Sequence, residues 1–443
     1  MGSESNVSTK KLQDSGGTRP ARTTLENGLR VVALEQSNLH RALVALYVRV
    51  GSRFENEKTN GLSHFLEHML YRGTPTLKTA HDVNLAFESL GGYLYAATQV
   101  DYAVFSVAVP LESLEAACEL FAHVLTEPTF ADIELEKGIV CEEILEDLDD
   151  DGRQIDADNL SRELIYPNHP LGFTITGTEK TVRSFDVAML RDLHARHFVA
   201  EGSVLVFAGN IAEKSAFALA EKCFAKFPRG PRPTTSPPPS TQKKPRLLVL
   251  ENSSSQTELR VSFRALAEGA PDRPVLDMLM RLIDDGMSTR LYHRICDARG
   301  LCYDVTAGYD GYEDDGIVDF AAGVQHARAS QVTSEILGLM KELATDGPTE
   351  DELEKARRRH AWEIAAMQDS AEDTAGFYAH GLLFGRDPTP EGSTAALAKV
   401  TVEDVRAMAE RLCEPNRLNV VAVGLLEEDE EKRLRDAVTS WGK

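Results

Sequence analysis

A proline-rich segment near the middle of the chain constrains the fold more than any other feature. Residues 228–245 read PRGPRPTTSPPPSTQKKP. Proline lacks a backbone N–H and fixes φ, so this stretch cannot hold a helix or a central strand and favours an extended polyproline conformation. The sequence therefore predicts a linker at residues 230–245, between an N-terminal domain at 19–229 and a C-terminal domain at 246–443.

The two predicted domains repeat the same order of hydrophobic patterns. Each opens with two strand-like segments, continues with a helix rich in Leu and Met, a further strand and an amphipathic helix, and closes with an apolar strand. These segments are 29–34, 42–50, 61–71, 102–109, 111–125 and 203–207, and then 246–250, 258–263, 275–284, 316–322, 329–343 and 417–423. We interpret the order as an internal duplication of one α+β unit; two unrelated α+β domains are the alternative.

Charge and composition exclude several classes of protein. The formal net charge of −22 argues against a nucleic-acid binder, which needs a basic surface. No apolar run approaches the roughly 18 residues of a membrane span, so we expect no membrane partner. Residues 1–18 are polar and lack the apolar core of a signal peptide. We expect them to be a disordered tail and the protein to be cytoplasmic, or periplasmic if a signal peptide has been removed.

The strongest local motif is an inverted H-x-x-E-H at residues 61–70, GLSHFLEHML. His64 and His68 are four residues apart and share one face of a helix, so both imidazoles can bind one metal ion. Glu67 lies next to them and can reach water at that metal. Catalytic zinc sites use three protein ligands and keep a fourth position open. This motif therefore predicts a zinc site with one ligand still to be found.

An acidic segment supplies candidates for the missing ligand. Residues 134–146 read ELEKGIVCEEILE, and Glu136, Glu143 and Glu146 recur at helical spacing. Taken alone, such a run is typical of a solvated helix face. Because the histidine pair still needs a third ligand, one of these glutamates can instead be that ligand.

Two segments resemble the superfamily of insulinase, pitrilysin and the mitochondrial processing peptidase, the inverzincin zinc peptidases. Residues 61–74, GLSHFLEHMLYRGT, are similar to its signature, and 166–177, YPNHPLGFTITG, to its P-L-G-x-x-I-x-G segment. The size suggests a half-length, bacterial-type member. The resemblance implies two homologous domains, each a mainly antiparallel sheet flanked by helices, that form half of a clamshell chamber.

The resemblance also assigns roles at the metal. It implies one Zn²⁺ per chain on His64, His68 and Glu143, because Glu143 lies as far beyond His68 as the family's third ligand does. Glu67 would be the general base. Glu136 and Glu146 would lie behind the ligands and support them.

The family binds peptide substrates as an added strand on a sheet edge that usually reads N-A-x-T. Here residues 95–98 read YAAT, so Ala96 and Thr98 match, whereas Tyr95 replaces the Asn. In the C-terminal domain, active members carry an Arg and a Tyr that reach the substrate. Tyr303 matches the Tyr, but Cys296 stands at the Arg position.

This departure suggests a partner. A homologous subunit supplying Arg and Tyr would make the chain the zinc subunit of a heterodimer; a homodimer using Tyr303 alone, or Arg294 or Arg299, is the alternative. We expect a zinc endopeptidase that hydrolyses peptides or unfolded segments in an enclosed chamber. The alternatives are a non-catalytic or weakly active chamber or scaffold subunit, and a metal-dependent hydrolase of other substrates.

Overall fold

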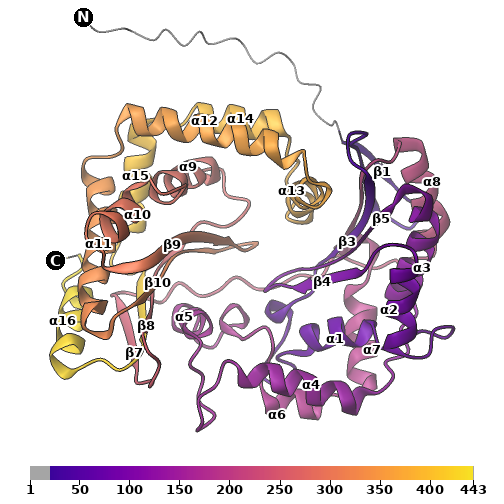
Figure 1. Ribbon diagram of the computed structural model, residues 1–443, viewed down its shortest axis with the longest axis horizontal. Helices are drawn as coiled ribbons and strands as arrows, with labels where there is room; N and C mark the ends of the chain where they lie inside the picture. Colours follow the sequence, from indigo (N-terminus) through magenta and orange to yellow (C-terminus); the bar gives the residue numbers. More distant parts are fainter. Residues whose placement is uncertain (1–19, 443) are drawn as a thin grey trace, which may run out of the picture.

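The computed structural model describes residues 20–442 as two β-sheets, each flanked by helices (Figure 1). The tail expected at residues 1–18 lies outside the described residues. The N-terminal sheet contains β1 (Ala21–Thr24), β2 (Arg30–Glu35), β3 (Arg41–Val48), β4 (Leu94–Thr98), β5 (Ala103–Pro110) and β6 (Ser203–Gly209). The C-terminal sheet contains β7 (Arg246–Leu250), β8 (Thr257–Ala265), β9 (Cys302–Gly311), β10 (Gly316–Val324) and β11 (Leu418–Val423).

Both sheets have the same topology. The N-terminal order is β1-β2-β6-β3-β5-β4, and the C-terminal order is β7-β11-β8-β10-β9. Apart from the additional β1, each sheet places its first and last strands side by side and parallel, and all other neighbours are antiparallel. This shared order is what an internal duplication of one α+β unit requires.

Helices lie on both sides of each sheet (Figure 1). The first half contains α1 (Leu62–Leu70), α2 (Ala80–Ser89), α3 (Leu114–Thr126), α4 (Ile133–Leu145), α5 (Ala157–Ile165), α6 (Glu179–Ser184), α7 (Val187–His197) and α8 (Glu213–Phe224). The second half contains α9 (Arg273–Ile283), α10 (Arg290–Tyr292), α11 (Ala329–Thr345), α12 (Glu350–Met367), α13 (Ala371–Leu383), α14 (Pro390–Ala398), α15 (Val402–Leu412) and α16 (Glu428–Thr439). Within the described residues, no helix has both the length and the apolar character needed to cross a bilayer.

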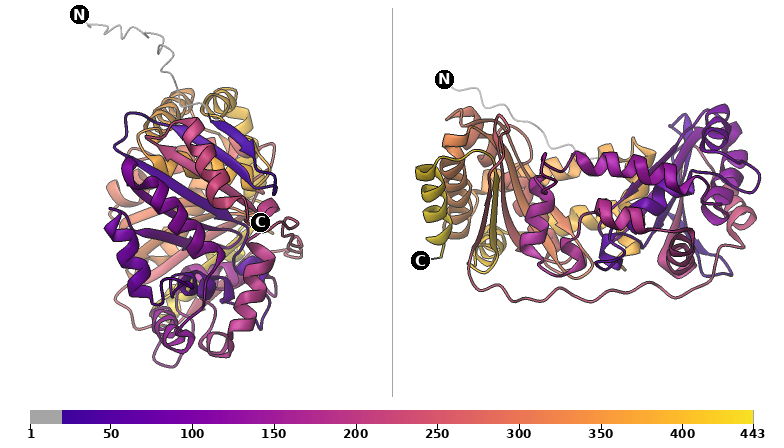
Figure 2. Two further views of the ribbon diagram at one scale, coloured as in Figure 1. Left: turned by 90° about the vertical axis from the view of Figure 1, so that its right-hand side faces the viewer. Right: turned by 90° about the horizontal axis from the view of Figure 1, so that it is seen from below.

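The inner faces of the sheets are covered by an exchange of helices between the two halves (Figures 1 and 2). Helix α13 of the second half packs Tyr378 and Leu383 against Leu43 and Val206 of the N-terminal sheet. Helix α5 of the first half packs Leu160 against Val421 of the C-terminal sheet. Each sheet therefore buries its inner face under a helix from the opposite half of the sequence.

The proline-rich segment joins the halves along one side of the molecule, as the right-hand view of Figure 2 shows. The structure has neither helix nor strand between Phe224 and Arg246. The proline-rich segment is nevertheless held in place, because Arg49 donates a hydrogen bond to the Pro233 carbonyl (3.1 Å) and Arg53 donates one to the Thr235 hydroxyl (2.9 Å).

The same two arginines hold the turn between β9 and β10. Arg49 pairs with Glu313 at 2.5 Å, and Arg53 Nη2 lies 2.5 and 2.6 Å from the two carboxylate oxygens of Asp314. Both arginine side chains have no exposed surface. The pairs therefore join the two halves through charges that water cannot solvate once a partner is removed.

We expect Asp314→Ala to destabilise the fold by about 3–5 kcal/mol, because it leaves the buried Arg53 guanidinium without its carboxylate. The measurement is the shift of the unfolding midpoint in urea. Asp151→Ala is the control, since Asp151 pairs with Arg153 on an exposed loop and such pairs contribute about 1 kcal/mol or less. Equal shifts in the two variants would contradict a structural role for the Arg53–Asp314 pair.

Candidate active site

Helix α1 carries the H-x-x-E-H motif and is fixed at its N-terminus by a buried carboxylate. Glu55 accepts hydrogen bonds from the backbone N–H groups of Gly61 (2.8 Å) and Ser63 (2.7 Å). A negative charge at this position satisfies free N–H groups and complements the helix dipole.

Close backbone packing holds the same end of the helix. Gly61 has φ of 92°, and a Cβ on it would lie 2.5 Å from the Thr176 carbonyl oxygen and 2.7 Å from the Gly177 Cα. A Cβ on Gly177 would likewise lie 2.5 Å from the Asn60 carbonyl oxygen. Only glycine fits at both positions. The 166–177 segment therefore acts as a support for the start of α1.

Three potential ligand atoms converge between α1 and α4. His64 Nε2 lies 3.4 Å from Glu143 Oε1, and His68 Nε2 lies 3.7 Å from Glu143 Oε2. All three ligand atoms lie within 4.8 Å of one another. Two atoms that each bind zinc at about 2.1 Å with tetrahedral angles are separated by about 3.4 Å, so these residues fit a zinc ion in number, chemistry and spacing.

Glu136 lies behind one of the histidines. Its Oε1 accepts a hydrogen bond from His68 Nδ1–H at 2.8 Å, and its Oε2 forms an ion pair with Arg72 Nε at 3.1 Å. This carboxylate therefore orients the imidazole so that Nε2 is turned toward Glu143. Carboxylate–histidine pairs of this kind fix the tautomer of a metal ligand and increase its basicity.

The two histidines differ in their electrostatic surroundings. Burial, and then the neighbouring His68, lower the pKa of His64 to about 3, so its ring stays neutral and available as a ligand. Burial also acts to lower the pKa of His68, but the hydrogen bond with Glu136 and the charge of Glu67 raise it overall. The site thus has one histidine that burial keeps neutral near pH 7 and one that a carboxylate makes more basic.

Glu67 is held by the sheet edge next to α1. The hydroxyl of Thr98, at the end of β4, donates a hydrogen bond to Glu67 Oε2 at 2.5 Å. Burial raises the pKa of Glu67, with the Thr98 hydrogen bond acting in the opposite direction. Because Thr98 contacts only Oε2, the other oxygen is left for water or substrate. A carboxylate with a raised pKa suits proton transfer near neutral pH.

The structure also places the remaining predicted site residues. Ala96 lies on β4 and packs toward the core that contains α1, whereas Tyr95 points to the other face and is 53% exposed. Glu146 caps the C-terminus of α4, next to Glu143. Tyr303 is the second residue of β9 in the other sheet, is 93% exposed and makes no hydrogen bond to the metal-ligand candidates in the described residues.

Cys296 and the second-half helix lack the chemistry of α1. Cys296 lies in a short π-helical segment, His293–Asp297, and its Sγ is 3.8 Å from the Sγ of Cys302, the first residue of β9. On α9, which follows β8 as α1 follows β3, Arg273 pairs with Asp277, and Arg281 pairs with Asp285 just beyond the end of the helix. His64, His68 and Glu143 form the one metal-ligand group found in the described residues.

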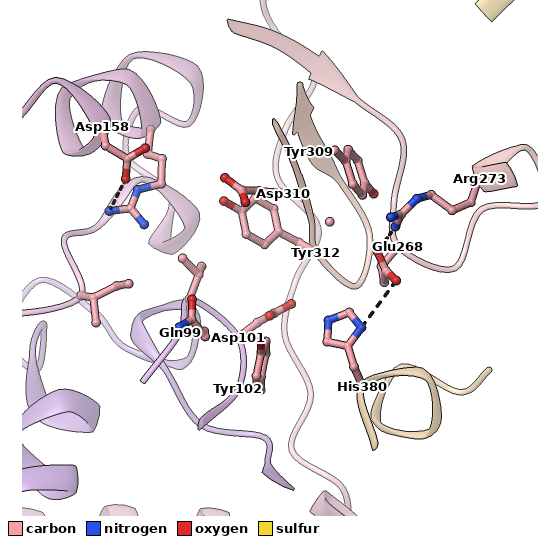
Figure 3. Close-up of a pocket in the computed structure, with 14 residues that line it drawn as sticks. Gln99, Asp101, Tyr102, Asp158, Glu268, Arg273, Tyr309, Asp310, Tyr312 and His380 are labelled. Atoms are coloured by element: carbon pink, nitrogen blue, oxygen red, sulfur yellow. Dashed lines mark hydrogen bonds and ion pairs between the residues drawn. The ribbon is translucent and has the colours of Figure 1, made fainter. Parts of the chain in front are cut away.

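A polar hollow of about 490 Å³ lies beyond the end of β4, between the two halves of the chain (Figure 3). Asp101 and Tyr102 approach it from the β4–β5 turn, Asp310 and Tyr312 from the end of β9, and His380 from α13. Burial raises the pKa of Asp101 to about 7, although Arg53 and Arg49 act in the opposite direction. Strand β4 therefore runs past Glu67 and ends next to this polar hollow, which is lined by residues of both halves.

Three contacts that support the site were not predicted from the sequence. Glu55 holds the helix start from an upstream loop, Arg72 pairs with Glu136, and Thr98 contacts Glu67. Arg72 lies four residues after His68, a spacing that could have signalled its contact with the same carboxylate. Glu55 carries no such signal, because it does not occupy the usual N-cap position of the helix.

Two family models match the chain. Residues 30–179 match the model described as "Insulinase (Peptidase family M16)", and residues 184–359 match the "Peptidase M16 inactive domain" model. The first match contains His64, Glu67, His68 and Glu143. The second contains α9, where ion-paired residues stand in place of a metal motif.

Relatives match over most of the chain. An uncharacterized zinc protease of Mycobacterium tuberculosis is 31% identical over 401 residues, which span 89% of this chain and 90% of that relative. The uncharacterized zinc protease YmxG of Bacillus subtilis is 30% identical over 398 residues, 88% of this chain and 95% of that relative.

Solved structures share the fold. A protease from Helicobacter pylori superposes with a TM-score of 0.86 at 21% identity, covering 92% of this chain and 99% of that chain. A peptidase M16 inactive domain structure from Pseudomonas fluorescens gives a TM-score of 0.84 at 22% identity, with the same coverage.

Proposed function

This chain belongs to the M16 insulinase family, as residues 61–74 predicted, and on that premise we propose that it is a zinc-dependent endopeptidase. One observation carries the proposal: the ligand atoms of His64, His68 and Glu143 converge at zinc-like spacing, and Glu67 lies on the same helix. Relatives are named zinc proteases, which supports the choice of metal and of reaction class.

The residues of the chain suggest how hydrolysis would proceed. A bound zinc ion supplies a Lewis acid that polarises a carbonyl group and lowers the pKa of water to about 7. Glu67 would take the proton of the attacking water and pass it to the leaving amine. Thr98 would hold Glu67 in place through Oε2, and Glu136 would keep His68 turned toward the metal.

The edge of the N-terminal sheet offers a place for the peptide. Strand β4 is the last strand of the sheet order, so among residues 20–442 one side of its backbone is free to pair. A peptide added along Leu94–Thr98 would pass the strand end where Thr98 contacts Glu67. Main-chain pairing of this type binds extended peptides with little dependence on sequence.

The test is a digest of a mixed peptide library, with zinc content measured on the same sample. We expect about one zinc per chain and peptide cleavage that stops with a chelator and returns when zinc is added. A non-catalytic chamber subunit would bind little or no zinc and leave the library intact. Cleavage that persists after complete metal removal would overturn the proposal.

Glu136→Gln is expected to weaken zinc binding by about 10–100-fold, because a neutral amide polarises His68 less than a carboxylate does. Competition with a zinc-binding dye measures the affinity. Glu134→Gln is the control, since this exposed residue on the same helix pairs only with Lys137. The same loss of affinity in both variants would show that the effect is a general loss of charge.

We further propose that a homologous subunit, or a second copy of this chain, completes the substrate-binding site. Two observations support this: the Tyr303 side chain is 93% exposed, and position 296 holds a cysteine that contacts Cys302. Peptidase activity and light scattering, measured with and without a homologous chain, provide the test. Full activity from a monomer of this chain alone would exclude the need for a partner.

A further inference from the structure

A second hollow, of about 480 Å³, lies on the inner face of the N-terminal sheet, under α13. Side chains alternate along β4, so Thr98 turns toward Glu67 while Tyr95 turns to this opposite face. The hollow is therefore separate from the predicted metal site, yet it shares the edge strand with it. Its volume falls in the range of about 300–1,000 Å³ that is typical of ligand pockets.

Small residues create this space. The strand register places Tyr95 of β4 opposite Ser106 of β5, and Ser106 opposite Ala45 of β3. Ser106 and Ala45 thus form a low floor next to Tyr95. Above them lies Gly376 of α13, where a Cβ would meet only the Tyr47 hydroxyl at 3.5 Å. Helix and sheet stay apart here because neither contributes a large side chain at this point.

The walls of the hollow are aromatic. Tyr47 and Tyr102 stack with ring centroids 6.5 Å apart, and Tyr102 meets His380 edge-on at 5.4 Å. Phe377 of α13 adds a further ring. Figure 3 shows Tyr102 and His380 at the boundary with the polar hollow. Rings that pack in offset and edge-on geometries favour a further aromatic ring over an aliphatic group of similar size.

The charged groups around the hollow are already neutralised. Glu372 pairs with Arg41 at 2.8 Å, and Arg386 pairs with Glu268. Burial, with Arg386 and Arg273 nearby, lowers the pKa of His380 to about 4, so this ring is neutral. Because each of these groups is paired or neutral, none of them favours a charged ligand. The lining thus suits an uncharged aromatic side chain.

We propose that this hollow binds one aromatic side chain of the peptide substrate, with Tyr95 as the residue that selects it. The proposal rests on the proposed peptidase function and on pairing of the peptide with β4. The row Ala45–Ser106–Tyr95 ends at the sheet edge, so its next member is a residue of the added strand. A large ring at that position would lie against the half-exposed Tyr95 ring and reach over it into the hollow.

The experiment uses zinc-loaded full-length protein and peptides in which one Phe is moved through an Ala- and Ser-rich background. We expect one position at which Phe raises kcat/KM at least about 100-fold over Ala, with Leu between them, because apolar pockets discriminate by about 10–200-fold per small group. Gly376→Leu fills the hollow and should reduce the Phe/Ala ratio at that position by about tenfold or more.

Gly338→Leu is the matched control, because it adds the same side chain to a helical glycine of α11 whose nearest neighbour is 4.0 Å away. It should keep the Phe/Ala ratio. Tyr95→Ala is the second variant; its half-exposed site makes misfolding no concern, and it should lower the ratio as Gly376→Leu does. An unchanged ratio in either variant overturns the proposal. Cleavage without any Phe preference also overturns it while leaving the peptidase function intact, whereas absence of all cleavage rejects the function itself.

Discussion

Replacing Glu67 by glutamine is expected to lower kcat by about 10²–10⁴-fold while zinc content stays near one per chain. The amide has nearly the same shape as the carboxylate but cannot take a proton. Its position is set by Thr98 and by α1, and both contacts survive the change. The loss should therefore appear in kcat rather than in zinc affinity.

The measurement is steady-state cleavage of a single peptide, with zinc determined on the same sample. Glu57→Gln is the matched control, since Glu57 is an exposed carboxylate in the loop before α1. It should leave both kcat and zinc unchanged. If the Glu67 variant kept most of its turnover, another group would have to act as the base.

Glu143→Gln is expected to weaken zinc binding at least about 100-fold, more than the 10–100-fold effect of changing a group behind a ligand. The neutral amide removes the negative charge that faces His64 and His68. Peptidase activity should then depend on added zinc and disappear at limiting metal. Dialysis against a zinc buffer, followed by metal analysis and assay, measures both effects.

Glu142→Gln provides an unusually close control, because Glu142 is the preceding residue on α4 and is exposed. Its substitution changes the net charge of the helix by the same amount. Only a residue whose side chain enters the site should alter zinc affinity, so the pair separates ligation from long-range electrostatics. Equal losses would reject Glu143 as the third ligand.

Most of the sheet framework could be predicted from the sequence because hydrophobic patterns report local burial. The strands at 203–207 and 246–250 and the helices around 61–71 and 134–146 are found in the structure with small shifts of their ends. Strand β9 was not predicted, since as an edge strand it is mostly exposed and lacks a continuous apolar pattern.

The candidate site was predictable where residues act through spacing along one helix. His64 and His68 lie on α1 and needed only helical periodicity, whereas Glu143 on α4 depended on the family resemblance. Contacts that arise only when distant segments pack, such as Thr98 with Glu67, leave no periodic signal. The same limit applied to Tyr303, whose match to the family gave no information on where its side chain lies.

The exchange of α5 and α13 affects whether the two halves can separate after the backbone between them is cleaved. Duplicated proteins often consist of repeats that fold separately. Here, without the second half, Leu43 and Val206 of the N-terminal sheet would lose the cover of α13. Without the first half, Val421 of the C-terminal sheet would lose the cover of α5. Nicking the proline-rich segment should therefore yield two fragments that stay bound and do not separate without denaturant. Expressed alone, either fragment would present an apolar sheet to water and aggregate, so the duplicated chain forms a single cooperative folding unit.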